Sequence, residues 1–221
     1  MLAKDLISDV VPALRTSDTG LRALNWMEIF RVSHLPIVNN KDFLGLISDT
    51  DIYDLNMANE PIGNHKLSLF SPYVVADTHI YGVIEIVSRL KITVVPVLNA
   101  RKEYLGLVTM TDLMGHFAEL TAMKNPGGIL VLELHENDYS LSQIAQIVEG
   151  NDAKILSLYI SSPSESMKME LTLKINRTDL SSIIQTFERY NYIIKSTFMV
   201  DEEMDVFYNN RFEEFMKYLS M

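Results

Sequence analysis

The chain has 221 residues, 48% apolar and 22% charged, which is the composition of folded domains and not of disordered protein. It carries 19 Lys and Arg against 29 Asp and Glu, and a net charge of −10 would repel phosphate backbones and anionic lipid. We therefore expect no nucleic-acid partner and no membrane partner. Cysteine is absent, which excludes disulfides, thiolate metal sites and thiol nucleophiles. Because no apolar leader and no long charge-free apolar stretch occurs, we expect a cytoplasmic protein of two or three compact units.

An internal repeat covers roughly the first half of the chain. The coinciding residues are Pro12 with Pro72, Pro36 with Pro96, Gly45 with Gly106 and Asp51 with Asp112. The offset is 60 up to the second proline and 61 after it. One inserted residue explains the change, and it falls in the polar turn-forming runs at 39–42 and 99–103, where hairpin loops tolerate changes of length.

Each copy has the periodicity of a strand, a helix, two strands and a second helix. In the first copy, the expected elements after the leading strand are a helix at 18–30, strands at 35–38 and 43–47, and a helix at 49–56. In the second copy, they are a helix at 78–90, strands at 93–98 and 104–108, and a helix at 111–120. The repeat therefore predicts two βαββα units in tandem.

The hairpin of each copy carries a more specific pattern, an apolar-Pro-apolar-apolar strand followed by Gly-apolar-apolar-Ser/Thr-x-x-Asp. It reads Leu35-Pro36-Ile37-Val38 with Gly45-Leu46-Ile47-Ser48-Asp49-Thr50-Asp51, and Val95-Pro96-Val97-Leu98 with Gly106-Leu107-Val108-Thr109-Met110-Thr111-Asp112. This pattern resembles a tandem pair of CBS domains over about residues 1–120. The resemblance implies repeats at 1–60 and 61–120, related by a pseudo-two-fold axis.

The two Ser/Thr and Asp pairs are candidate ligand contacts. At a strand-to-helix junction, the hydroxyl of Ser48 or Thr109 and the first-turn N–H groups form a donor cluster that suits an anionic group. Asp51 and Asp112 follow three residues later on about the same face, where a carboxylate can accept hydrogen bonds from two ribose hydroxyls. CBS resemblance implies the same role, since the aspartate of such pairs commonly contacts ribose and adenine lies between apolar strands. The alternative is that the hydroxyls are helix N-caps and the aspartates stabilise the first turn.

Cationic side chains near these junctions are few. His34 stands where nucleotide-binding CBS sequences often carry a basic residue, but the second copy has Val94 there, so the two clefts are expected to differ. Arg31, Arg89 and Lys91 precede the same strands and are interpreted either as phosphate contacts or as solvated helix-end charges. Because a desolvated phosphate needs a charged partner, this pattern leaves room for a ligand of low negative charge, such as adenosine or S-adenosylmethionine, or for no ligand.

A linker is expected at 121–128, followed by a domain at 129–200 with the order βαββαβ. Its clearest strand alternates apolar Met169, Leu171, Leu173 and Ile175 with polar neighbours. The order resembles an ACT domain, a ferredoxin-like regulatory fold that often forms dimers and binds amino acids. Amino-acid-binding ACT domains usually carry Gly at the turn into the first helix, where this chain has Ser140, so dimer formation is the expected role.

The last segment, 201–221, is predicted to contain an amphipathic helix at 206–219. Its apolar stripe consists of Phe212, Phe215, Met216 and Leu219. A CBS pair followed by an ACT-like domain, in a chain of this size, resembles the layout of the acetoin-utilisation AcuB-type proteins.

The sequence thus predicts an α+β protein that binds an adenosine-type ligand (AMP, ADP, ATP, adenosine or S-adenosylmethionine) between its CBS repeats. The expected ligand contacts are His34, Ser48, Asp51, Thr109 and Asp112. No catalytic residue, metal or required cofactor is expected, because the histidines lack metal-ligand spacing and His135, Glu136 and Asp138 read as a solvated loop. We expect a homodimer that acts on an unidentified effector protein. The alternatives are a ligand-free dimerisation scaffold and an enzyme without a recognisable motif.

Overall fold

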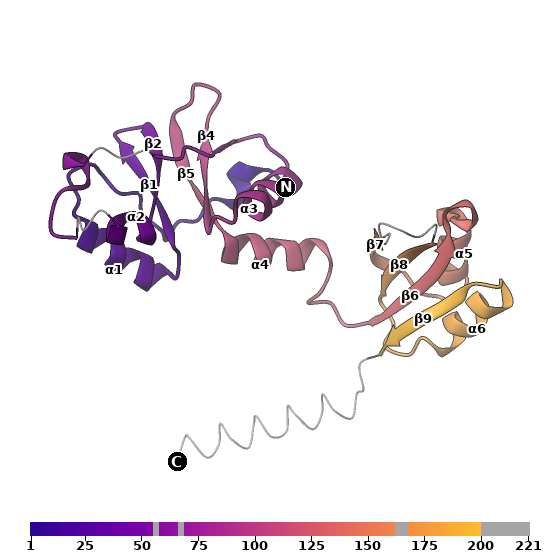
Figure 1. Cartoon of the computed structure of the whole chain (residues 1–221). Coiled ribbons are helices and arrows are strands. Elements are labelled where there is room, and N and C mark those ends of the chain that lie inside the picture. Colours follow the sequence, from indigo (N-terminus) through magenta and orange to yellow (C-terminus); the bar gives the residue numbers. More distant parts are fainter. Residues whose placement is uncertain (55–57, 66–68, 162–167, 200–221) are drawn as a thin grey trace, which may run out of the picture. The chain divides into compact units, whose positions relative to one another are not determined.

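The computed structural model describes residues 1–54, 58–65, 69–161 and 168–199. The chain divides within helix α4 into two compact units, Met1–His116 (unit 1) and Phe117–Met221 (unit 2), shown in Figure 1. Each unit has its own hydrophobic core. The fold is mixed α and β, as the sequence predicts.

The first copy of the repeat is a helix, a hairpin and a short helix. Its elements are α1 (Gly20–Phe30), β1 (His34–Asn39), β2 (Asp42–Ser48) and α2 (Asp49–Asp54). Thr19 begins α1 as its N-cap, because its hydroxyl accepts a hydrogen bond from the N–H of Arg22. The strands pair antiparallel, and Asn40 takes the left-handed conformation in the tight turn between them.

The second copy repeats this order with a short leading strand. Its elements are β3 (Val74–Val75), α3 (Ile80–Leu90), β4 (Val94–Leu98), β5 (Tyr104–Thr109) and α4 (Met110–Leu120). Strand β3 pairs parallel with β4, and β4 pairs antiparallel with β5. The turn between β4 and β5 is longer than that of the first copy, which agrees with the residue inserted at 99–103.

In the first copy the predicted leading strand is reduced to a single parallel bridge between Leu14 and Ile37. The parallel pairing does not continue past Leu14, because the next backbone donor, Thr16 N–H, forms its hydrogen bond with a side chain. Thr16 N–H donates to the side-chain oxygen of Asn39 at 3.4 Å, whereas the equivalent Ala76 N–H in the second copy donates to the backbone carbonyl of Leu98 at 2.8 Å.

The segments that lead into the two copies pack on opposite copies. Ser8 N–H donates to the Leu107 carbonyl of β5, and Leu46 N–H of β2 donates to the Phe70 carbonyl, both at 2.8 Å. Gly106 and Gly45 lie under these crossings, and a Cβ added at either would clash with the crossing segment. The segment that leads into each copy therefore packs on the hairpin of the other copy, and both copies share one hydrophobic core.

After the end of α4, the described residues of unit 2 form a four-stranded antiparallel sheet with the two helices α5 and α6. Its elements are β6 (Gly128–His135), α5 (Leu141–Glu149), β7 (Ile155–Ser161), β8 (Lys168–Ile175), α6 (Ser181–Arg189) and β9 (Ile193–Phe198). The strand order is β7-β8-β6-β9. The predicted βαββαβ order is therefore observed, and the strand order is that of a ferredoxin-like fold. Assignment to the ACT class stays a prediction.

One face of this sheet is apolar and the other is charged, as the alternation in β8 predicts. Met169, Leu171, Leu173 and Ile175 are buried in the same core cluster as residues of α5 and α6. The opposite face carries two ion pairs, Glu133 with Lys168 and Glu170 with Lys195.

At the start of α6, Asp179 accepts hydrogen bonds from the N–H and hydroxyl of Ser181 at 2.9 and 2.6 Å, although Leu180 holds the N-cap position. The amphipathic helix predicted at 206–219 lies outside the described residues. Within the described ranges, no helix combines the length and the apolar character needed to cross a membrane.

Candidate functional site

The two Ser/Thr and Asp pairs sit at equivalent strand-to-helix junctions. Ser48 ends β2 and its hydroxyl donates to Asp51 Oδ2 at 2.7 Å, while the N–H of Asp51 donates back to Ser48 Oγ at 3.1 Å. Thr109 ends β5, and the corresponding distances to Asp112 are 2.8 and 3.0 Å. Each pair therefore forms a reciprocal cap on the first turn of the helix, which is the structural role that the sequence left open.

This capping uses only part of each carboxylate. The hydrogen bonds of Asp51 and Asp112 go to Oδ2, and within the described residues no hydrogen bond reaches Oδ1 of either aspartate. A carboxylate oxygen can accept two hydrogen bonds. The cap and a ligand contact are therefore compatible at the same residue.

His34 joins the first junction to the second copy. It pairs with Ser48 across the hairpin, and its Nδ1 accepts a hydrogen bond from the N–H of Thr93 at 3.4 Å. The Thr93 hydroxyl lies 3.2 Å from the same nitrogen and accepts from Ser33 N–H at 2.9 Å. Since Nδ1 is an acceptor, the ring carries its proton on Nε2.

The environment of His34 also favours its neutral form. Burial lowers the pKa of His34 below its ordinary value of 6.5, and the nearby Asp49 and Asp51 carboxylates only partly oppose this shift. At neutral pH, His34 offers a hydrogen-bond donor to a ligand and not a positive charge.

The two junctions differ in enclosure. In the second copy the position of His34 is taken by the buried Val94, which pairs with Thr109. Thr109 is buried at 6% exposure, and Asp112 is half-buried, whereas Asp51 is exposed. The second junction is therefore less exposed to water, so each hydrogen bond to a ligand there contributes more to the free energy of binding.

The other cations considered from the sequence have structural roles. Arg89 forms an ion pair with Glu85 on the surface of α3. Arg31 and Lys91 end α1 and α3 as exposed C-caps in the left-handed conformation, with φ of 55° and 53°. A hollow of about 350 Å³ in unit 1 lies between the segment at 70–73 and the end of α3. Arg89 lines it, but none of the five expected ligand contacts does, namely His34, Ser48, Asp51, Thr109 and Asp112.

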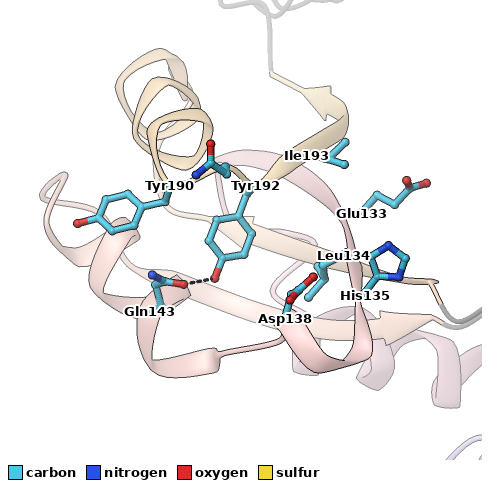
Figure 2. A pocket seen from close by; sticks show the side chains of 9 residues that line it. Glu133, Leu134, His135, Asp138, Gln143, Tyr190, Tyr192 and Ile193 are labelled. Carbon is cyan, nitrogen blue, oxygen red and sulfur yellow. Dashed lines mark hydrogen bonds between the residues drawn. The ribbon is translucent and has the colours of Figure 1, made fainter.

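In unit 2, the loop after β6 is exposed, as expected, at His135, Glu136 and Asp138. Ser140 is the N-cap of α5 and accepts a hydrogen bond from Gln143 N–H at 3.4 Å. This loop and the turn before β9 line a hollow of about 500 Å³, whose lining side chains are drawn in Figure 2. Sequence reasoning missed it because the two segments lie far apart in the chain.

Among the described residues, no group of three or more histidines, aspartates or glutamates is arranged to hold a metal ion.

Unit 1 is thus a duplicated helix-and-hairpin module with a polar junction at the end of each hairpin. The family model that describes CBS domain sequences matches residues 3–58 and 68–119, which correspond to the two copies. The chain therefore contains a tandem pair of CBS domains.

Solved structures with a similar fold match about half of this chain. A CBS domain pair/ACT domain protein from Thermotoga maritima is 18% identical over 54% of this chain and 98% of its own, with a TM-score of 0.46. A protein from Vibrio cholerae described as an acetoin utilization protein (AcuB) is 21% identical over 56% and 95%, with a TM-score of 0.47. CBSX2, solved in complex with AMP, is 16% identical over 53% and 96%, with a TM-score of 0.46.

Proposed function

We propose that the CBS pair binds an adenosine-type ligand and that the protein is a regulatory sensor and not a catalyst. The observation that carries this proposal is the duplicated junction, in which Asp51 and Asp112 cap a helix through Oδ2 and leave Oδ1 for a ligand. Two adjacent ribose hydroxyls match such an acceptor, because both can donate to one carboxylate. We propose that the adenine ring lies beside the apolar strands β1 and β4, which pair with the strands that end at the two junctions.

Enclosure favours the second junction as the tighter site. Thr109 directly precedes the 11-residue helix α4, whose first-turn N–H groups and positive dipole end can meet a polar group of the ligand. Asp112 is half-buried there, so a hydrogen bond from ribose competes less with water than it would at the exposed Asp51.

Charge favours a ligand with few phosphates. His34 is a neutral donor, and the carboxylates of Asp49 and Asp51 lie close to it. A triphosphate at the first junction would meet the negative charges of Asp49 and Asp51, and the neutral His34 would not balance the triphosphate's own charge, which is costly once water is displaced. We therefore propose that adenosine or S-adenosylmethionine binds more tightly than ATP, with AMP and ADP between them.

The signal is proposed to pass through the contact between the copies. Ser33, His34 and Thr93 already connect them, so a ligand held by both copies would favour one relative orientation over others. We propose that a cytoplasmic homodimer, paired through an ACT-type unit 2, transmits this change to an effector protein.

A thermal-shift screen tests the proposal. Full-length protein is heated with AMP, ADP, ATP, adenosine, S-adenosylmethionine or, as a base control, guanosine. A ligand that binds only the native state stabilises it by about 2.7 kcal/mol at about 100 times its Kd, which corresponds to a rise in Tm of roughly 5 °C or more. We expect this rise with adenosine or S-adenosylmethionine, and its loss in an Asp51→Ala/Asp112→Ala double variant that still unfolds cooperatively.

The same screen separates the alternatives. If none of the adenosine compounds raises Tm, the sensor proposal is wrong and a ligand-free dimerisation scaffold takes its place. If guanosine stabilises the protein as much as adenosine does, the pocket recognises ribose and not the adenine base.

A further inference from the structure

The hollow in unit 2 has the dimensions of a small-molecule site. It holds about 500 Å³, within the range of roughly 300–1,000 Å³ in which small ligands bind. It lies between the end of β6 with its following turn, the start of α5 and the turn between α6 and β9 (Figure 2). The side chains that matter for its chemistry are Glu133, His135, Asp138, Gln143, Tyr190 and Tyr192.

The Tyr192 hydroxyl presents an acceptor to this hollow. Its proton is donated to Gln143 Oε1 at 2.8 Å, as the dashed line in Figure 2 shows. The phenol oxygen therefore has lone pairs left for a donor from a ligand, but no proton to give. Burial and, secondly, the Asp138 carboxylate raise the pKa of Tyr192, so the phenol stays protonated and this bond to Gln143 is kept.

The negative charge of the hollow is not fully balanced. Glu133 is paired with Lys168 at 2.6 Å, so its charge is compensated. Asp138 lines the hollow near Tyr192 and forms no ion pair with any other residue in the described part of the chain. One carboxylate thus faces a space that also offers the Tyr192 oxygen.

Aromatic rings complete the wall. Tyr190 and Tyr192 both line the hollow, and Tyr192 is held against Phe187 in an edge-to-face contact with ring centroids 5.4 Å apart. A fixed tyrosine ring attracts a cation placed over its face. Carboxylate, phenol oxygen and aromatic faces are together complementary to a ligand that is positively charged and rich in N–H donors.

We propose that this hollow binds a small organic cation, a primary amine or a guanidinium, whose N–H groups donate to Asp138 and to the Tyr192 oxygen. This site lies in unit 2, whereas the proposed adenosine site lies in unit 1, so each of the two proposals can be tested without the other.

Isothermal titration calorimetry with the full chain tests this site. The probes are 1,4-diaminobutane and agmatine, and the controls are 1,4-butanediol and succinate, which match the diamine in length but lack its charge or reverse it. We expect the two cations to bind, the diol and the diacid not to bind, and the affinity to fall as salt is added.

Two variants of the same turn locate the site. Asp138→Asn removes the unbalanced charge from an exposed side chain and should weaken binding about tenfold or more, the usual effect of losing a hydrogen bond to a charged group. Glu136→Gln removes an equal charge from a neighbouring residue that does not line the hollow, and should change Kd less than about twofold. Equal losses in both variants, no loss in Asp138→Asn, or no heat with either cation at millimolar concentration would overturn the proposal.

Discussion

His34 shows how one residue ties the candidate site to the stability of the fold. Its Nδ1 accepts a hydrogen bond from Thr93, and burial lowers its pKa below 6.5. The unfolded chain therefore takes up a proton more readily than the folded one as pH falls below about 6.5. By linkage, the contribution of His34 to the free energy of unfolding is present above this pH and is lost as pH falls through the folded pKa.

Comparison of wild type with His34→Gln isolates this effect. Gln can still accept a hydrogen bond from Thr93 but does not titrate. We expect wild type to lose more stability than the variant between about pH 7.5 and about pH 5.5 in urea denaturation, since the other titrating groups are common to both proteins. Equal losses would show that His34 is not held neutral by the fold.

Part of this residue-scale picture could be predicted from the sequence. The Ser/Thr-x-x-Asp spacing identifies Ser48 with Asp51 and Thr109 with Asp112 as neighbours, and they are hydrogen-bonded. Local spacing could not reveal that Thr93, from the other copy, holds His34, because that contact depends on how the copies pack.

At the scale of elements, the segment that leads into each CBS copy packs on the other copy, and these contacts hold unit 1 together. Gly106 of β5 lies beneath the crossing at Ile7, and an added Cβ would overlap the Ile7 side chain. We expect Gly106→Ala to reduce the free energy of unfolding by about 1–3 kcal/mol, as overpacking does elsewhere. Urea denaturation of the full chain measures this loss.

Gly115 provides the matched control for that substitution. It lies inside α4, and no described atom outside its own helix is within 4 Å of an added Cβ. Gly115→Ala should therefore stabilise the helix by up to about 1 kcal/mol. If both variants gave the same change in stability, the crossing would not be tightly packed at Ile7.

Helices and hairpins were predictable because each has apolar residues at its own period and turn residues at its ends. Strand β8, whose apolar residues stand at every second position and are all buried, is the clearest case. The exceptions are elements whose form depends on distant partners. The leading strand of the first copy shrinks to one bridge because Asn39 takes the next donor, and periodicity contains no signal of that competition.

At the scale of the whole molecule, the segment 121–128, expected as a linker, lies within unit 2 and is hydrogen-bonded to its sheet. The carbonyls of Thr121 and Gly127 accept hydrogen bonds from Ser157 and Lys174, both at 2.8 Å. The backbone at 121–127 is irregular and β6 begins at Gly128. The loss of periodicity in this segment contains no signal of the side-chain contacts from β7 and β8.

The sensor proposal makes a prediction for the assembled protein. A ligand held by both CBS copies should change the compactness of the proposed homodimer, because binding favours one conformation over the others. Small-angle scattering with and without saturating adenosine or S-adenosylmethionine measures the radius of gyration. Superimposable curves, at a ligand concentration where calorimetry shows full binding, would contradict this coupling.

The most direct test of the account is the affinity of Asp112→Ala for adenosine and S-adenosylmethionine, measured by calorimetry beside Thr19→Ala. Both variants lose a helix cap, worth about 1 kcal/mol, but Thr19 caps α1 and is not one of the proposed ligand contacts. We predict that Asp112→Ala weakens binding about tenfold or more while Thr19→Ala leaves Kd within about twofold. An unchanged Kd in Asp112→Ala would return this aspartate to a capping role alone and contradict the proposed site.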